Sequence, residues 1–316
     1  MPKVLVTARS FVKSKKAVEL LEKENYEIIY NLEDRPLKEH ELLVLVNGIH
    51  AIIAGVDEIT EKVIAKAMPT LKIIARHGVG VDHVDLGAAK KYNIVVTSTP
   101  GANSIAVAEL TIGLMLALAR HVTVINTGIR KNSWQRILGT ELNNKTLGVV
   151  GLGNIGCEVV KRLSSFNMKI LAFDKYKNKE MTEKYKFKYT SLDELLEQSD
   201  LITLHLNVTD ETKGIINKDS LERMREKAFL INVARGELIV EEDLFNALKN
   251  KKIAGAALDV FENEPLINSP FFKLENVILT SHVGAYTAES VERMATMAAL
   301  EVIRVLSGEE PENKII

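Results

Sequence analysis

The sequence predicts an α/β protein made of two lobes, each built around a parallel sheet. Short apolar runs alternate with helical patterns along almost the whole chain, which is typical of repeated strand–helix units. A glycine-rich turn joins one such run to a helix near the middle of the sequence. The 316 residues are enough for about two domains.

Bulk composition limits the partners that the chain can have. The formal net charge is −1, so electrostatics favours neither nucleic acid nor an anionic membrane. Cys157 is the only cysteine, which excludes an internal disulfide or a thiolate metal cluster and fits a reducing cytoplasm. The first ten residues run directly into a strand pattern rather than a signal peptide. We therefore expect a cytoplasmic protein with no metal, nucleic-acid or membrane partner.

The first hundred residues alternate between strand and helix patterns. Apolar runs with strand character stand at Val4–Thr7, Glu27–Tyr30, Leu42–Val46, Ala51–Ala54, Lys72–Ala75 and Ile94–Val96. Helical patterns stand at Val12–Glu22, Thr60–Ala67 and Asp85–Lys91, the second with Thr60 as a candidate cap. This order predicts a parallel sheet with helices on both faces.

Two segments join this first part to the middle of the chain. Asn103 or Ser104 is expected to cap a long apolar helix at Ile105–Arg120. Its apolar part contains Glu109 and is too short to span a bilayer, which favours a buried helix. The following segment, 130–144, is polar, and its Trp134 is either a packing anchor or a residue that inserts into a partner subunit.

The stretch Leu147–Asp174 carries the most informative pattern. An apolar run leads into Gly151-Leu-Gly-Asn-Ile-Gly156, then a helical pattern, then a second apolar run that ends in Asp174. Gly151 permits the tight turn, Gly153 lets the backbone approach a pyrophosphate, and Gly156 lets helix and strand pack closely. The helix N-terminus offers free N–H groups to the phosphates. This is the pattern of a Rossmann-like dinucleotide-binding unit.

Asp174 bears on which dinucleotide binds. Its carboxylate can accept hydrogen bonds from both ribose hydroxyls and would repel a 2′-phosphate, which favours NAD over NADP. The alternative is a solvated turn residue before Lys175. The lysine-rich stretch that follows, 175–188, has the composition of an exposed surface.

Beyond this unit, four apolar runs each end in polar residues. They are Leu201–Leu204 before His205, Ala228–Ile231 before Asn232 and Arg235, Ala254–Leu258 before Asp259, and Val277–Thr280 before Ser281 and His282. Helical patterns stand at Leu192–Gln198, Asp219–Arg225 and Glu242–Lys249. Because ligands of open α/β sheets bind beyond the carboxyl ends of the strands, we expect these polar residues where the dinucleotide lies.

Three side chains supply the chemistry that a nicotinamide site needs. Arg235 has a planar, permanently charged fork that matches a carboxylate, and histidine chemistry suits His282 to exchange one proton. Glu264 could orient that imidazole and favour its charged form, although Glu262 competes for the role. Each alone could be a surface ion pair or a structural group, whereas their joint placement favours hydride exchange with an oxo acid.

The chain closes with a long amphipathic helix at Thr287–Ser307. Its return to the first lobe would make that lobe discontinuous. We expect residues 1–100 with 287–316 to form a substrate-binding (catalytic) domain and residues 101–286 to form an NAD-binding Rossmann domain. The active site would then lie in the cleft between two Rossmann-like or flavodoxin-like lobes. The glycine-rich loop Arg76–Asp85 could bind an anion there, or be a turn with a capping Asp.

Several segments together resemble the D-isomer-specific 2-hydroxyacid dehydrogenase family, and its D-3-phosphoglycerate dehydrogenase branch most. The resemblance covers nearly the whole chain, with motifs at 76–86 (RHGVGVDHVDL), 99–120, 141–156, 231–239 (INVARGELI), 257–265 (ALDVFENEP) and 279–287 (LTSHVGAYT). It implies an NAD-dependent oxidoreductase acting on the CH–OH group of a D-2-hydroxy acid. It also implies a homodimer in which Trp134 reaches the active site of the partner subunit.

The motifs and the resemblance together assign expected roles to individual residues. The catalytic set would be Arg235, Glu264 and His282. Cofactor contacts would be Gly151, Gly153, Asn154, Ile155, Gly156, Asp174, His205, Val233, Ala234, Arg235, Asp259, His282, Gly284 and Ala285. Substrate contacts would be Arg76, Val79, Gly80, Asn103, Arg235 and His282, together with Trp134 from the partner subunit.

Departures from the family pattern bear on the substrate. Ala54–Glu58 lacks the basic residue that some relatives use for a substrate phosphate, although Arg76 is another candidate. Leu206 and Asn207 follow His205 where relatives usually have a proline. We expect no C-terminal regulatory domain of the kind that some phosphoglycerate dehydrogenases have. We expect 3-phosphoglycerate and a role in serine biosynthesis first, with glyoxylate or hydroxypyruvate as the alternative. The alternative of another class is an NAD(H)-sensing, corepressor-like binding protein.

Overall fold

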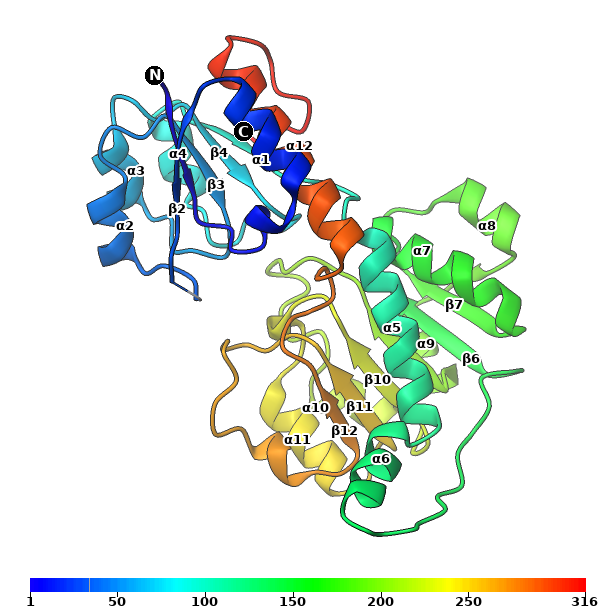
Figure 1. Ribbon diagram of the computed structural model, residues 1–316. Coiled ribbons are helices and arrows are strands. Elements are labelled where there is room, and N and C mark those ends of the chain that lie inside the picture. Colours follow the sequence, from blue (N-terminus) through cyan, green and yellow to red (C-terminus); the bar gives the residue numbers. More distant parts are fainter. Residues whose placement is uncertain (34) are drawn as a thin grey trace. The chain divides into compact units, whose positions relative to one another are not determined.

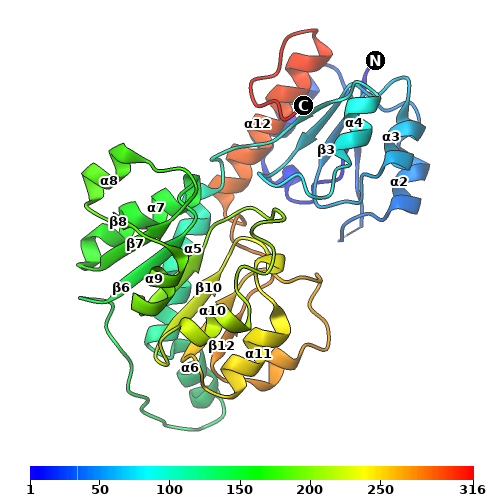
Figure 2. The ribbon, with the colours of Figure 1, turned by 180° about the vertical axis from the view of Figure 1, so that it is seen from behind.

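The computed structural model describes residues 1–33 and 35–316. The chain divides into two compact units, one of residues 1–103 and 286–316 and the other of residues 104–285. Figure 1 shows each unit as a sheet with helices on both faces, and Figure 2 shows the same ribbon from behind. Both sheets are parallel throughout the described pairs, so the predicted α/β class is confirmed.

The first unit contains a five-stranded sheet in the order β2-β1-β3-β4-β5. The strands are β1 (Lys3–Val6), β2 (Glu27–Tyr30), β3 (Ala51–Ala54), β4 (Ile73–Arg76) and β5 (Val95–Thr97). One face packs on α1 (Lys15–Lys23) and on α12 (Ala288–Leu306), which comes from the end of the chain. The other face packs on α2 (Glu39–Leu45), α3 (Glu61–Ala67) and α4 (Leu86–Lys91). Burial on both faces explains why its strands read as continuous apolar runs.

The run Leu42–Val46 lies mostly in helix α2, and the predicted strand there is wrong. The Lys38 N–H donates to the side chain of Glu41 (2.9 Å) and so closes the first turn of the helix. Leu42 and Val46, the first and last residues of the run, are fully buried, while Val44 is 79% exposed. A short apolar run fits a strand or a single buried helix turn equally well, and here the acidic first turn stabilises the helix.

Helix starts in this unit also differ from expectation. α1 begins at Lys15 rather than Val12, because Ser14 accepts a hydrogen bond from a first-turn N–H (3.2 Å) and caps the helix there. Thr60 does occupy the N-cap position of α3. Its hydroxyl donates to Glu39 (2.7 Å), however, and makes no capping hydrogen bond to the helix.

The second unit contains a seven-stranded sheet in the order β12-β11-β10-β9-β6-β7-β8. The strands are β6 (Thr146–Val150), β7 (Lys169–Phe173), β8 (Lys188–Tyr189), β9 (Leu201–Leu204), β10 (Phe229–Asn232), β11 (Gly255–Leu258) and β12 (Val277–Leu279). One face carries α5 (Ser104–Ala119), α7 (Asn154–Leu163) and α8 (Lys179–Tyr185), and the other carries α9 (Leu192–Gln198), α10 (Lys218–Arg223) and α11 (Glu241–Lys249). The four strands that end in polar candidates, β9 to β12, are therefore neighbours.

The start and end of α5 were not fully predicted. Asn103 Oδ1 and Ser104 Oγ are both buried without a hydrogen-bond partner in the described part of the chain, so neither oxygen caps the helix. A further helix, α6 (Val122–Arg130), follows His121, whose left-handed backbone (φ 53°) separates the two helices. Among the described helices none is long and apolar enough alone to cross a membrane. Only α5 and α6 taken together, bent by 65°, have the length and composition.

Candidate active site

The glycine-rich loop connects β6 to α7, and its glycines have different surroundings. A Cβ on Gly156 would stand 2.1 Å from the carbonyl oxygen of Gly151, and a Cβ on Gly151 would stand 2.7 Å from the backbone of His205. No described atom lies within 4 Å of a Cβ on Gly153. The loop is thus tightly packed at both ends and open in the middle, at the N-terminus of a ten-residue helix. This shape suits a pyrophosphate.

Asp174 follows β7 and its carboxylate holds the glycine-rich loop. Oδ2 accepts from the Leu152 N–H (2.6 Å) and Oδ1 accepts from the Tyr176 N–H (2.8 Å). The turn role and the loop role therefore coexist in one side chain. A carboxylate oxygen has two lone pairs, so these bonds leave capacity for ribose hydroxyls. Nearby, burial and the charges of Asp174 and Glu158 raise the pKa of the Cys157 thiol.

His205 follows β9, and both of its ring nitrogens lie in a buried setting. Nε2 is 3.0 Å from Thr203 Oγ1, and Nδ1 has no hydrogen-bond partner among the described residues. Burial lowers the pKa of His205 to about 3, so the ring is neutral near pH 7. A neutral ring gives no charge to a phosphate, and the contact of this residue with the loop is through its backbone, beside Gly151.

Glu264 and His282 are in direct contact. Glu264 Oε2 lies 2.8 Å from His282 Nδ1, and Glu264 Oε1 accepts from the Phe261 N–H (3.1 Å). Burial acts to raise the pKa of the Glu264 carboxyl, but the hydrogen bond and charge of His282, the Phe261 N–H and the charge of Arg235 outweigh it, so this pKa lies below its ordinary value. Since Nδ1 is committed to the carboxylate, Nε2 is the nitrogen available for proton exchange.

The structure therefore separates the two glutamates that the sequence left as alternatives. Glu262 is exposed, and its N–H donates to Glu241 (2.9 Å). The described contact with the imidazole belongs to Glu264, in which Oε1 is held by its own turn and Oε2 by the ring. The geometry favours Glu264 as the partner of His282.

Arg235 lies in the turn after β10, with an extended backbone (φ −146°, ψ 142°). Its Nη1 donates to the Ala234 carbonyl oxygen (2.7 Å). Gly236 explains how this turn comes close to that of Glu264, because a Cβ on Gly236 would stand 2.0 Å from the carbonyl carbon of Phe261. Only glycine permits this backbone contact, and the sequence pattern did not predict this role for Gly236.

Asp259 is 1% exposed and holds the loop that carries His282. Its carboxylate accepts from the Thr280 hydroxyl (2.6 Å) and from the N–H groups of Val283 (2.9 Å) and Gly284 (2.8 Å). Its carbonyl oxygen accepts from the His282 N–H (2.8 Å). The His282 backbone is left-handed (φ 51°), a conformation that a non-glycine residue keeps only when its surroundings enforce it. Asp259 provides that support.

The remaining predicted cofactor residues also belong to the second unit. Asn154 and Ile155 form the first turn of α7. Val233 and Ala234 are 6% and 9% exposed in the turn after β10, and Ala285 is partly buried after the His282 loop. Their contacts with a cofactor stay predictions.

The predicted substrate residues of the first unit lie mainly in the loop after β4. Arg76 Nε donates to the carbonyl oxygen of Gly80 (2.8 Å), and its Nη1 donates to that of Ala54 (3.3 Å) and to that of His77. The guanidinium therefore shapes its own loop, in which Val79 is 37% exposed. Asn103 lies apart from this loop in the chain, at the end of the segment that leads into α5.

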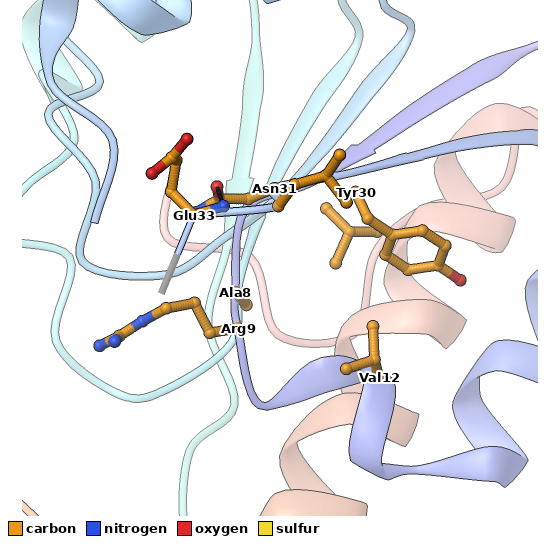
Figure 3. Close-up of a pocket in the computed structure, with 8 residues that line it drawn as sticks. Ala8, Arg9, Val12, Tyr30, Asn31 and Glu33 are labelled. Atoms are coloured by element: carbon orange, nitrogen blue, oxygen red, sulfur yellow. Dashed lines mark hydrogen bonds between the residues drawn. The ribbon is translucent and has the colours of Figure 1, made fainter. Parts of the chain in front are cut away.

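A hollow of about 200 Å³ lies beside the ends of β1 and β2 in the same unit (Figure 3). Among the described residues, its lining contains one cationic side chain, Arg9, and one carboxylate, Glu33, together with Tyr30 and Asn31. This mixed charge does not single out an anionic ligand.

Trp134 lies in the segment after α6 and is 86% exposed, and Leu138 is 95% exposed. α6 has no fully buried residue, and Val122 and Ile129 on it are about half exposed. Large apolar side chains in water mark a candidate contact surface for another chain.

Comparison with known proteins assigns the family. The model for the D-isomer specific 2-hydroxyacid dehydrogenase, NAD binding domain, matches residues 112–284, which include the glycine-rich loop and the Arg235, Glu264 and His282 groups. The chain belongs to the D-isomer specific 2-hydroxyacid dehydrogenase family. The predicted family, the NAD cofactor and the oxidoreductase class, acting on a CH–OH donor, are thereby confirmed.

Relatives of this dehydrogenase carry two kinds of name. Glyoxylate reductase from Thermofilum pendens is 41% identical over 292 residues, which are 90% of this chain and 86% of the relative. D-3-Phosphoglycerate dehydrogenase from Methanocaldococcus jannaschii is 43% identical over 282 residues, 88% of this chain. The chain spans 52% of the length of that second relative.

Solved structures agree with the fold of the dehydrogenase. The TT0316 protein from Thermus thermophilus superposes with a TM-score of 0.91 at 36% identity, covering 99% of this chain and all of that one. A glyoxylate reductase from Paecilomyes thermophila superposes with a TM-score of 0.88 at 29% identity, covering 99% and 98%. The open space at Gly153 and the carboxylate after β7 fit NAD.

Proposed function

We propose that this dehydrogenase transfers hydride between NAD and C2 of a small D-2-hydroxy or 2-oxo acid, with Arg235, His282 and Glu264 as its catalytic residues. The observation that supports this best is the 2.8 Å contact between Glu264 and His282, with the Arg235 charge near enough to affect that carboxylate. NAD supplies the acceptor or donor of the hydride when it is bound.

Each of the three side chains has one task in the reduction of an oxo acid. Arg235 binds the C1 carboxylate through paired N–H groups, and its charge polarises the C2 carbonyl. His282 gives its Nε2 proton to the carbonyl oxygen as the hydride arrives at C2. Glu264 stabilises the charged imidazole before that transfer. In the oxidation direction, His282 takes the hydroxyl proton.

We place glyoxylate and hydroxypyruvate first among the substrates. A phosphorylated acid needs a cation for its distal group, and the described segment 54–58 has none. The other candidate, Arg76, donates to carbonyl oxygens of its own loop and to that of Ala54 at the end of β3. 3-Phosphoglycerate remains the second candidate, because a relative named for that activity is 43% identical.

A substrate panel tests both the activity and this order. NADH absorbance is followed with glyoxylate, hydroxypyruvate and phosphohydroxypyruvate, with NADPH as the cofactor control. We expect NADH-dependent turnover with kcat/KM highest for an unphosphorylated acid. Preference for the phosphorylated acid would reverse the substrate order. Absence of turnover with every acid, despite NADH binding, would overturn the assignment of the catalytic residues.

The exposed surface around Trp134 supports a homodimer, in which this residue approaches the substrate of the partner subunit. The 86% and 95% exposure of Trp134 and Leu138 would be relieved in such a contact. Light scattering with size-exclusion chromatography measures the state directly. We expect a dimer, and we expect Trp134→Ala to raise KM for the oxo acid. A monomeric, fully active enzyme would contradict this.

A further inference from the structure

We propose that Asn232 is a positioning residue for Arg235, and that it joins the turn of Arg235 to the loop of His282. This inference rests on the proposed role of Arg235 in binding the substrate carboxylate. Asn232 is the last residue of β10 and is 0% exposed. A buried amide has to satisfy its donors and its acceptor inside the protein, so its partners show what it holds.

Both ends of the Asn232 amide bind the backbone of the turn that follows. Oδ1 accepts from the Ala234 N–H (3.1 Å), and Nδ2 donates to the Arg235 carbonyl oxygen (2.7 Å). Because one partner is a donor and the other an acceptor, the orientation of the amide is fixed by its surroundings. The side chain therefore holds the peptide group before Ala234 and the one after Arg235. These two contacts determine the position from which the guanidinium extends.

The backbone of Asn232 reaches the second catalytic loop. Its carbonyl oxygen accepts from the Asp259 N–H (2.9 Å), and the Asp259 carbonyl oxygen accepts from the His282 N–H (2.8 Å). A continuous path of hydrogen bonds thus runs from Arg235 through Asn232 and Asp259 to His282. All four residues belong to the second unit. The arginine that binds the acid and the histidine that exchanges its proton share one buried support.

Removal of the Asn232 amide should therefore lower kcat/KM by more than a loss of folded protein alone would cause. Asn232→Ala deletes both contacts. Asn232→Asp keeps the shape and the acceptor for Ala234, but replaces the donor to Arg235 with an oxygen. Misplacement of a binding group by about 1 Å can cost about 100-fold in rate. We expect kcat/KM for glyoxylate to fall by about 10- to 100-fold in both variants, through a higher KM and a lower kcat together.

Asn276 provides a matched control. It precedes β12, at the opposite end of the strands, and its Nδ2 donates to the carbonyl oxygens of Leu248 (3.2 Å) and Ala254 (3.4 Å). It is thus another asparagine that bridges backbone segments, away from the catalytic turn. Asn276→Ala should lower the melting temperature and leave kcat/KM close to that of the wild type.

A double-mutant cycle separates positioning from general support. If Asn232 acts through Arg235, then Asn232→Ala should add less than about threefold to the loss already caused by Arg235→Lys. Losses that multiply would overturn the inference, as would an Asn232→Ala enzyme whose kcat/KM is within about threefold of wild type. If Asn232→Ala does not fold, Asn232→Asp takes its place in the cycle. Failure of the proposed function is distinct, because Arg235→Lys itself would then leave glyoxylate turnover unchanged.

Discussion

Glu264→Gln isolates the charge of the Glu264–His282 pair. Glutamine is close to glutamate in shape, so a hydrogen bond to His282 Nδ1 can persist while the negative charge is lost. We expect slower reduction of the 2-oxo acid, because a neutral amide stabilises the proton-donating form of the imidazole less than a carboxylate does.

The size of the effect follows from the exposure of the pair. A hydrogen bond to a charged group contributes about 1.5–3 kcal/mol. The side chains of Glu264 and His282 are 36% and 43% exposed, and solvent screening at such a site lowers the contribution to about 1–2 kcal/mol. Since about 1.36 kcal/mol is a factor of ten, kcat/KM should fall by about 5- to 30-fold at pH 7.

Steady-state NADH oxidation with glyoxylate or hydroxypyruvate at pH 7 measures this ratio of kcat/KM values. Glu262→Gln is the control. It removes the same charge from an exposed side chain that lies two residues before Glu264. It should leave kcat/KM unchanged. An unchanged kcat/KM in Glu264→Gln, or an equal loss in Glu262→Gln, would refute the reasoning.

Three further outcomes are expected. Gly153→Ala, whose Cβ meets no described atom, should weaken NADH binding about tenfold or more without changing the melting temperature. Gly156→Ala, whose Cβ would stand 2.1 Å from the carbonyl oxygen of Gly151, should lower both the affinity for NADH and the melting temperature. Fluorescence titration and thermal unfolding measure the pair, and equal effects would contradict the loop geometry. Burial, helped by the Arg76 charge, lowers the pKa of His77 from 6.5 to about 4. Between these values the unfolded chain binds a proton that the folded one does not, so stability should fall by up to roughly 3 kcal/mol as the pH drops through this window. His77→Gln should flatten that fall in urea titrations, and an unchanged slope would show that His77 is not its source. Val56→Arg adds a cation to the segment after β3 and should raise kcat/KM for phosphohydroxypyruvate relative to glyoxylate by about tenfold. An unchanged ratio would place the distal recognition elsewhere.

Sequence patterns were sufficient to predict which residues lie at the carboxyl edge of the sheet in the second unit. A strand buried on both faces reads as a short apolar run, and parallel strands end at one edge. β9, β10, β11 and β12 therefore bring their following residues to the same side, and their order in the sheet is consecutive. The glycine-rich loop could also be predicted from the sequence, because steric contact at position 156 permits no residue other than glycine there.

Features that depend on the detailed backbone conformation could not be predicted from the sequence. The choice between Glu262 and Glu264 depends on a turn in which the Phe261 N–H holds one of the two carboxylates. The supporting roles of Asn232 and Gly236 depend on how two turns meet, and residue type alone does not show this. Helix α2 was missed because an apolar run of five residues has too few positions to distinguish a period of 2 from one of 3.6.

Substrate specificity has to come from residues other than the three proposed catalytic residues. Arg235, Glu264 and His282 are proposed to act on the C1 carboxylate and the C2 oxygen, which every 2-oxo acid has, so these groups do not discriminate among such acids. Overall identity does not discriminate either, since it is 41% to a glyoxylate reductase and 43% to a D-3-phosphoglycerate dehydrogenase. Selection must come from contacts with the rest of the acid, where an unpaired phosphate is costly to bind. In this chain the loops proposed for that task use their polar groups internally. Asp57 accepts from the Leu37 N–H (2.7 Å), and Arg76 donates within its own loop. A phosphate would have to compete with those bonds, whereas a small unphosphorylated acid would leave them intact.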